Sequence, residues 1–164
     1  MNQMLEQVQS SAEQWGGVNN IINTWLVERQ ELIRIYCSLT VKEPEGESGK
    51  VEFAQNLEHF CEVLVDYLSA GHFEVFTELE NEARCFDARG IKLVKAIYPY
   101  LEQSTEIALW FNDRCDQLQH SDTRTEQIRS ELSYLGESLT DRFELEDQLI
   151  EYVHRANATV LQEH

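Results

Sequence analysis

Hydrophobic residues recur at steps of three and four along most of the chain, which is the period of amphipathic helices. The first apolar stripe begins at Val18, passes through Trp25 and ends at Leu39. It predicts one helix of about six turns. The pair Gly16-Gly17 precedes this stripe, and glycine is a poor helix former. We therefore expect a separate short helix over about 3–13.

The clearest break in the pattern is the segment 42–50, KEPEGESGK, where one proline and two glycines stand among polar residues. Such a composition predicts an exposed loop between two helices. The helical period resumes at Phe53 and ends near Gly71. We place Gly71 as the C-terminal cap of that second helix, because glycine is the preferred residue just past a helix end.

Three further helices follow in the pattern. A short one is predicted over 72–83, a long one over 91–118, and a last one from 123 to about 154. Pro99 should kink the long helix or start it afresh, since proline lacks an N–H and clashes with the preceding turn. Four major helices with short connections predict an all-α fold, an antiparallel four-helix-bundle-like single domain over 1–164 with short extra helices.

The composition supports an all-α fold and argues against binding to nucleic acid or spanning a membrane. Only 2 Pro and 7 Gly occur in 164 residues, too few for the frequent turns of β-sandwiches and barrels. With 13 Lys+Arg against 30 Asp+Glu, the net charge is -17, which excludes nucleic acid as a direct ligand.

The longest apolar run has five residues, 107–111, against about 20 for a membrane span. We expect a cytoplasmic protein without a membrane segment or a secretory signal, whose four cysteines, with no C-x-x-C pair, are reduced.

Negative charge is concentrated in one part of the chain. Residues 43–82 hold eleven acidic side chains and one basic side chain, Lys50. Glu58, Glu62 and Asp66 are spaced by four, so they share one face of the second helix. This face either serves solubility or docks a basic partner. Aromatic residues between 67 and 76 favour docking, because interface cores use such anchors and charged rims steer association.

The last helix carries polar residues where its apolar series should point inward. Arg142 and Glu146 extend the series that runs through Leu135 and Leu139. One interpretation is an ion pair between residues four apart at the edge of the core. The other is a bundle that is open at this end and presents a polar, aromatic inner surface to a ligand.

The sequence has no enzyme signature. A carboxylate-bridged di-metal bundle needs two Glu-x-x-His motifs, and the chain has one, at Glu151 and His154, so we predict no metal and no cofactor. Glycine-rich phosphate loops and nucleophile elbows are absent from the sequence. The alternative function is a histidine phosphotransfer module that uses His59 or His72, although the acidic residues near both would repel a phosphoryl group.

The block at 60–73, FCEVLVDYLSAGHF, resembles the Rsd/AlgQ family of bacterial anti-sigma factors, the regulators of sigma D. Two more blocks agree with it, NNIINTWL at 19–26 and the segment 135–150. Their order and separation fit the family over about residues 5–155. One departure is Asn23, which stands where the family is expected to carry an acidic residue before the Trp-Leu pair.

The resemblance implies a helical anti-sigma factor that binds region 4 of the housekeeping sigma factor (sigma D). That region is a basic helix-turn-helix domain that reads the -35 promoter element and contacts core RNA polymerase, so capping it would block both contacts. We expect Asp66 to make a charge-assisted contact, with Tyr67 and Phe73 as apolar anchors. The other expected partner-binding residues are Glu62, Arg142, Phe143, Glu146 and Trp25. Trp25 forms either a wall of the same surface or part of the core.

Overall fold

The computed structural model is all-helical throughout the residues it describes, which are 2–41, 43–86, 88–118 and 125–163, with side chains within 18–41, 43–72, 74–82, 88–116 and 126–156. The five α-helices are α1 (Asn2–Thr40), α2 (Gly46–Ala70), α3 (Phe76–Phe86), α4 (Ala88–Leu118) and α5 (Thr125–Glu163), and a π-helical segment, η1 (Gly71–Val75), joins α2 to α3. No strand occurs in this part of the chain. The predicted all-α class is confirmed.

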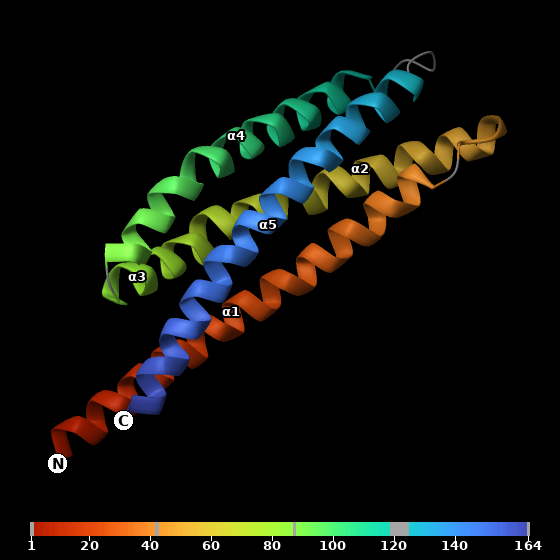
Figure 1. Ribbon diagram of the computed structural model, residues 1–164. Helices are drawn as coiled ribbons and strands as arrows, with labels where there is room; N and C mark the ends of the chain where they lie inside the picture. Colours follow the sequence, from red (N-terminus) through yellow and green to blue (C-terminus); the bar gives the residue numbers. More distant parts are fainter. Residues whose placement is uncertain (1, 42, 87, 119–124, 164) are drawn as a thin grey trace.

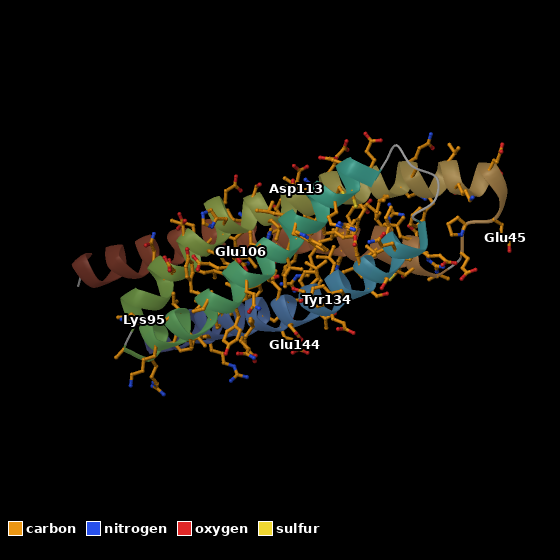
Figure 2. All side chains as sticks on the ribbon, turned by 90° about the horizontal axis from the view of Figure 1, so that it is seen from above. Glu45, Lys95, Glu106, Asp113, Tyr134 and Glu144 are labelled. Atoms are coloured by element: carbon orange, nitrogen blue, oxygen red, sulfur yellow. The ribbon has the colours of Figure 1, made fainter. Side chains whose placement is uncertain are left out.

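The four long helices pack side by side in an antiparallel bundle (Figure 1). Helix α1 packs along α2 and α5, while α4 packs along the other sides of α2 and α5. The short helix α3 covers one end of the bundle, against α4 and α5. Seen from above, Glu106, Asp113 and Glu144 point outward from α4 and α5 (Figure 2), as expected for a highly charged exterior.

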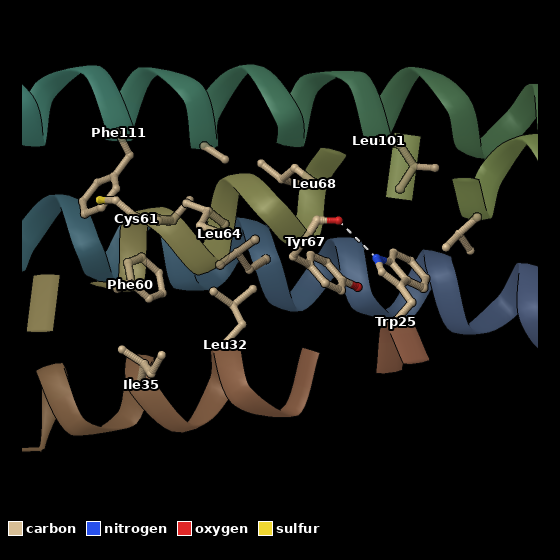
Figure 3. Packing of buried hydrophobic residues seen from close by; sticks show 14 of the residues in the cluster. Trp25, Leu32, Ile35, Phe60, Cys61, Leu64, Tyr67, Leu68, Leu101 and Phe111 are labelled. Atoms are coloured by element: carbon tan, nitrogen blue, oxygen red, sulfur yellow. Dashed lines mark hydrogen bonds between the residues drawn. The ribbon is translucent and has the colours of Figure 1, made fainter. Parts of the chain in front are cut away.

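The core is built from the apolar stripes of these helices. Figure 3 shows Ile35 and Leu32 of α1 facing α2, with Phe111 of α4 on the other side. The rings of Phe60 and Phe111 meet edge to face, with centroids 6.2 Å apart. Burying each large apolar side chain stabilises the fold by about 1.5–3 kcal/mol. These contacts join the α1–α2 pair to α4.

The prediction of a separate helix over 3–13 is wrong. Helix α1 runs without interruption from Asn2 to Thr40, through Gly16 and Gly17. A glycine inside a helix costs about 1 kcal/mol relative to alanine, but it meets no steric barrier to helical dihedrals. The long helix therefore absorbs the glycine pair.

The predicted loop 42–50 is also shorter in the structure than expected. Helix α2 begins at Gly46, which has a φ of 68°, in the left-handed region that favours glycine. The turn into α2 therefore needs Gly46. Gly49 instead lies inside the first turns of the helix, where its low helix propensity is tolerated.

Gly71 stands at the C-cap position of α2, as predicted, but it does not adopt the left-handed conformation of a glycine cap. Its φ of -57° and ψ of -50° are helical, and the chain continues through η1 into α3. A Cβ at this position would lie 3.1 Å from Cζ2 of Trp25. Glycine is favoured here because the Trp25 ring of α1 lies close to the backbone, and any side chain at 71 would press on that ring.

Two boundaries of the later helices also differ from prediction. Helix α4 continues through Pro99, so the expected fresh start at that proline is wrong. The packing of α4 against α3, α2 and α5 offsets the hydrogen bond that proline removes. Helix α5 extends past His154 to Glu163, and the predicted start at residue 123 lies outside the described residues.

Candidate partner-binding surface

A buried polar cluster lies where α1, α2 and α5 meet. The Tyr67 hydroxyl donates to Oε1 of Glu146 at 2.7 Å and accepts from Nε of Arg29 at 3.1 Å. Arg29 also pairs with Glu146 at 3.3 Å and with Asp147 at 2.5 Å. Tyr67 and Glu146 have no exposed surface, and Arg29 is 8% exposed. One residue from each of three helices thus shares a closed hydrogen-bond network.

Arg142 completes the buried polar cluster toward α4. Its Nε lies 3.2 Å from Oε2 of Glu146, so the ion pair between residues four apart is confirmed. Its Nη1 donates to the Leu101 carbonyl at 3.1 Å and to the Thr105 hydroxyl at 2.8 Å. The pair lies in the interior and not at the edge of the core, since Arg142 is only 2% exposed. Unpaired charges at this depth would be very costly, and here each has a partner.

Burial and pairing act in opposite directions on Glu146. Burial raises the pKa of its carboxyl, while the Arg142 charge, the Tyr67 hydrogen bond and the Arg29 charge each lower that pKa. The same burial, together with the negative charge of Glu146, raises the pKa of the Tyr67 hydroxyl. Tyr67 on α2 therefore keeps its proton and donates it in the hydrogen bond to Glu146 on α5.

Aromatic rings enclose the buried polar cluster. Trp25 stacks on Tyr67 with centroids 4.8 Å apart and an interplanar angle of 2°. The Trp25 indole N–H donates to the Tyr67 carbonyl at 3.1 Å, drawn as the dashed line in Figure 3. Phe76 meets Trp25 edge-on, and Phe143 meets Tyr67 edge-on. The Arg29 guanidinium lies 4.9 Å from the Phe143 ring centroid, a cation–π geometry.

The structure brings most of the predicted partner-binding residues together, but it places four of them inside the protein. The buried ones are Trp25, Tyr67, Arg142 and Glu146. Phe143 is half-buried, while Glu62 and Asp66 are exposed on α2. The side chain of Phe73 lies outside the described residues. In this conformation a partner can touch Glu62, Asp66 and Phe143 directly, and the four buried residues hold the scaffold beneath them.

An acidic groove runs between α1 and η1, beside the buried polar cluster. It has a volume of about 210 Å³, and Glu28, Glu74 and Trp25 are among its lining residues. Oε2 of Glu28 is buried and accepts no hydrogen bond within the described part of the chain. Burial, then Asp66 and Glu74, raise the pKa of Glu28. Three carboxylates from three elements thus act on one another at this surface.

A second groove, the α2–α4 groove, includes Asp66 in its lining. It has a volume of about 460 Å³. Its lining residues are Glu58, Cys61, Glu62, Val65, Asp66, Asn112 and Asp116. Asp66 therefore forms an acidic ridge, because it lines this groove and also acts on Glu28 of the acidic groove, so that negative potential from both adds.

Arg29 and Glu28 were missed by the sequence reasoning. Arg29 follows Trp25 by one turn and precedes Leu32 on the same apolar stripe. A basic residue on such a stripe signals a buried partner, as Arg142 does on α5. Glu28 carries no comparable signal, because its acidic neighbours Asp66 and Glu74 belong to other elements.

The structure disfavours phosphotransfer chemistry at His59. No cluster of three or more metal-binding side chains occurs among the described residues. Nδ1 of His59 lies 4.0 Å from a carboxylate oxygen of Glu62, which would repel a phosphoryl group.

Within the described ranges, no helix is both long and apolar enough to cross a membrane.

Comparisons with known proteins point to one family. The model of the Rsd/AlgQ family, described as regulator of the RNA polymerase sigma(70) subunit, matches residues 4–154. A protein named "Regulator of sigma D" from Yersinia pseudotuberculosis is 36% identical over 149 residues, 91% of this chain and 88% of its own length. The protein of that name from Pectobacterium atrosepticum is 32% identical over 151 residues, 92% of this chain and 99% of its own length.

Proposed function

The chain belongs to the Rsd/AlgQ family of regulators of the RNA polymerase sigma(70) subunit, and from this premise we propose how it acts. It is an anti-sigma factor and not an enzyme, and its partner is the housekeeping sigma factor. We propose that it binds region 4 of that factor in the cytoplasm. The bound complex can then neither read the -35 promoter element nor contact core polymerase, which frees core for other sigma factors.

The observation that carries this proposal is the acidic ridge at Asp66, which lines the α2–α4 groove and acts electrostatically on Glu28 of the acidic groove. A domain that binds DNA presents basic side chains to phosphate. Carboxylates of Glu28, Asp66 and Glu74 offer the same sign of charge as the DNA backbone. The acidic surface therefore competes with promoter DNA for one basic face of the sigma domain.

The buried polar cluster gives this surface its rigidity. Glu146 of α5 is bonded to Arg29 of α1 and to Tyr67 of α2. Asp66 directly precedes Tyr67 in the helix, so fixing Tyr67 fixes the Asp66 backbone. A preorganised contact residue loses less entropy on binding. The predicted site residues that are buried thus support binding by holding Asp66 in place.

A charge reversal on the ridge tests the proposal. Asp66→Arg should weaken binding to isolated sigma region 4 by about thirtyfold or more, because it sets like charges against each other. Glu106→Arg is the matched control, since it makes the same charge change at an exposed position on α4. We expect the control to stay within about threefold of the wild type. Equal losses in both variants would show that only net charge matters, and no loss in Asp66→Arg would move the contact elsewhere.

A further inference from the structure

Glu28 has an unpaired oxygen at the acidic groove between α1 and η1. Its Oε2 is buried and accepts no hydrogen bond from any residue that the structure describes, and Glu28 lines the groove. An ionised carboxylate can only accept hydrogen bonds, and a buried acceptor without a donor destabilises the fold. A donor that enters the groove, above all a cationic one, would remove this penalty.

The walls of the acidic groove are apolar, and carboxylates stand at its surface. Ile21 and Trp25 of α1 and Val75 of η1 line it, and none of these three side chains is exposed. Glu74 of η1 is also in the lining and is exposed, whereas Glu28 is half-buried. An occupant of the groove therefore meets apolar surface along its length and two carboxylates around its polar end.

The size of the acidic groove restricts what can occupy it. Its volume is about 210 Å³, below the roughly 300–1,000 Å³ of pockets for small-molecule ligands. A helix, about 10–12 Å wide, is too large, and a metal ion would lack ligands, because the described residues form no group of three or more metal-binding side chains. A single long side chain fits. Lysine and arginine lay their carbon stems along apolar surface and keep their charge among polar partners.

We propose that the acidic groove binds one lysine or arginine side chain of sigma region 4, and that Glu28 is the residue that holds its charge. The bound cation donates to Oε2 of Glu28, and Glu74 adds a second negative charge. The acidic groups that α5 brings toward this part of α1, Glu146 and Asp147, are paired with Arg29 and do not compete for the cation. This inference rests on the proposed function, in which region 4 is the basic partner, and it adds a specific contact on α1.

Binding at this site releases protons in mildly acidic solution. Burial, then the charges of Asp66 on α2 and Glu74 on η1, raise the pKa of Glu28 above its ordinary 4.5. A cation beside the carboxylate lowers that pKa again. The complex therefore holds fewer protons than the free protein, and its affinity increases as pH rises through the window above 4.5.

A double-mutant cycle tests the contact. Each lysine and arginine of isolated region 4 is replaced in turn by alanine, and every variant is titrated with the wild-type protein and with Glu28→Gln. Glu28→Gln alone should weaken binding by about tenfold. One basic residue of region 4 should lose most of its contribution when Glu28 is replaced, with a coupling of about fivefold or more.

Glu31→Gln is the matched control for the cycle. It makes the same chemical change three residues further along α1, at a carboxylate that is paired with Arg34 and does not line the groove. We expect no coupling between Glu31 and any basic residue of region 4.

Proton release gives a second measurement of the same contact. Calorimetry at pH 5, in two buffers of different ionisation enthalpy, counts the protons released when region 4 binds. The wild type should release more protons than Glu28→Gln, and its affinity should increase more than that of the variant between pH 5 and pH 7. Groups of region 4 that titrate on binding cancel in this difference.

The outcomes separate this inference from the proposed function. If no basic residue of region 4 couples to Glu28, or if the wild type and Glu28→Gln release equal numbers of protons, the acidic groove does not hold the side chain. The proposed function would survive that result, provided that the wild type binds region 4 and Asp66→Arg does not. If the wild type itself fails to bind region 4, the proposed function is wrong and the inference is wrong with it.

Discussion

The Tyr67 hydroxyl donates a 2.7 Å hydrogen bond to Glu146, 79 positions further along the chain, and neither residue has exposed surface. This bond joins α2 to α5 beneath the ridge that carries Asp66. Through Arg29 the same network reaches α1. Polar contacts thus hold three of the four bundle helices in register. Hydrogen bonds and ion pairs fix the direction of their partners, whereas apolar packing does not.

Removing the Tyr67 hydroxyl should weaken the fold measurably. Tyr67→Phe leaves Glu146 and Arg29 each short of one buried hydrogen bond, a cost of about 1–3 kcal/mol. Urea unfolding followed by circular dichroism measures it. Tyr134→Phe is the control, because Tyr134 is 57% exposed and should change the free energy of unfolding by less than about 0.5 kcal/mol. Equal stability of the two variants would contradict the role of the network.

Neutralising Glu146 should cost more. Glu146→Gln leaves the Arg29 and Arg142 guanidiniums without their shared buried carboxylate, and breaking a buried pair typically costs about 3–5 kcal/mol. The free energy of unfolding in urea again reports the loss. Glu144→Gln makes the same chemical change two residues away at an exposed position of α5, and it should leave that free energy nearly unchanged. A variant at 146 as stable as the one at 144 would mean that the carboxylate does not hold the cluster.

The helix pattern could be predicted from the sequence, because each apolar stripe is continuous in the chain and its period is set by local geometry. Residues that act across helices could not. Arg29 bonds to Tyr67, which lies 38 positions away along the chain, and to Glu146, which lies 117 positions away. No local pattern in the sequence indicates these pairs. The close approach of Trp25 to Gly71 could not be predicted for the same reason, since the Trp25 ring belongs to another helix.

Gly136 should resist replacement even by alanine. A Cβ there would overlap the Tyr36 hydroxyl and lie 2.5 Å from its ring carbon Cζ, and Tyr36 is bonded to the Leu132 carbonyl at 3.2 Å. We expect Gly136→Ala to lose about 1–3 kcal/mol of the free energy of unfolding by overpacking, despite the better helix propensity of alanine. At Gly49 a Cβ would meet Pro44 at 3.4 Å, so Gly49→Ala should be neutral or stabilising. The opposite order of stabilities would refute this packing.

Glu28 and Glu31 should give opposite pH dependence. Burial, Asp66 and Glu74 raise the pKa of Glu28 above its ordinary 4.5, so the folded chain holds a proton that the unfolded chain has released. The stability that Glu28 contributes therefore falls as pH rises through the window above 4.5. The Arg34 hydrogen bond lowers the pKa of Glu31, so its contribution is present at neutral pH and is lost as pH falls below that same value.

Unfolding of two variants between pH 3 and pH 7 measures this difference. Relative to the wild type, Glu28→Gln should become more stable as pH rises above about 4.5, and Glu31→Gln should become less stable as pH rises from 3 to about 4.5. Parallel curves for the two variants would show that the acidic groove does not act on Glu28.

The most direct test of the central claim is calorimetric titration of this protein with isolated region 4 of the housekeeping sigma factor at low and at high salt. The account predicts saturable binding that weakens as salt rises, because the acidic ridge at Asp66 contributes through charge. Binding that is saturable but insensitive to salt would contradict the charge-based surface. No binding even at low salt would contradict the proposed interaction itself.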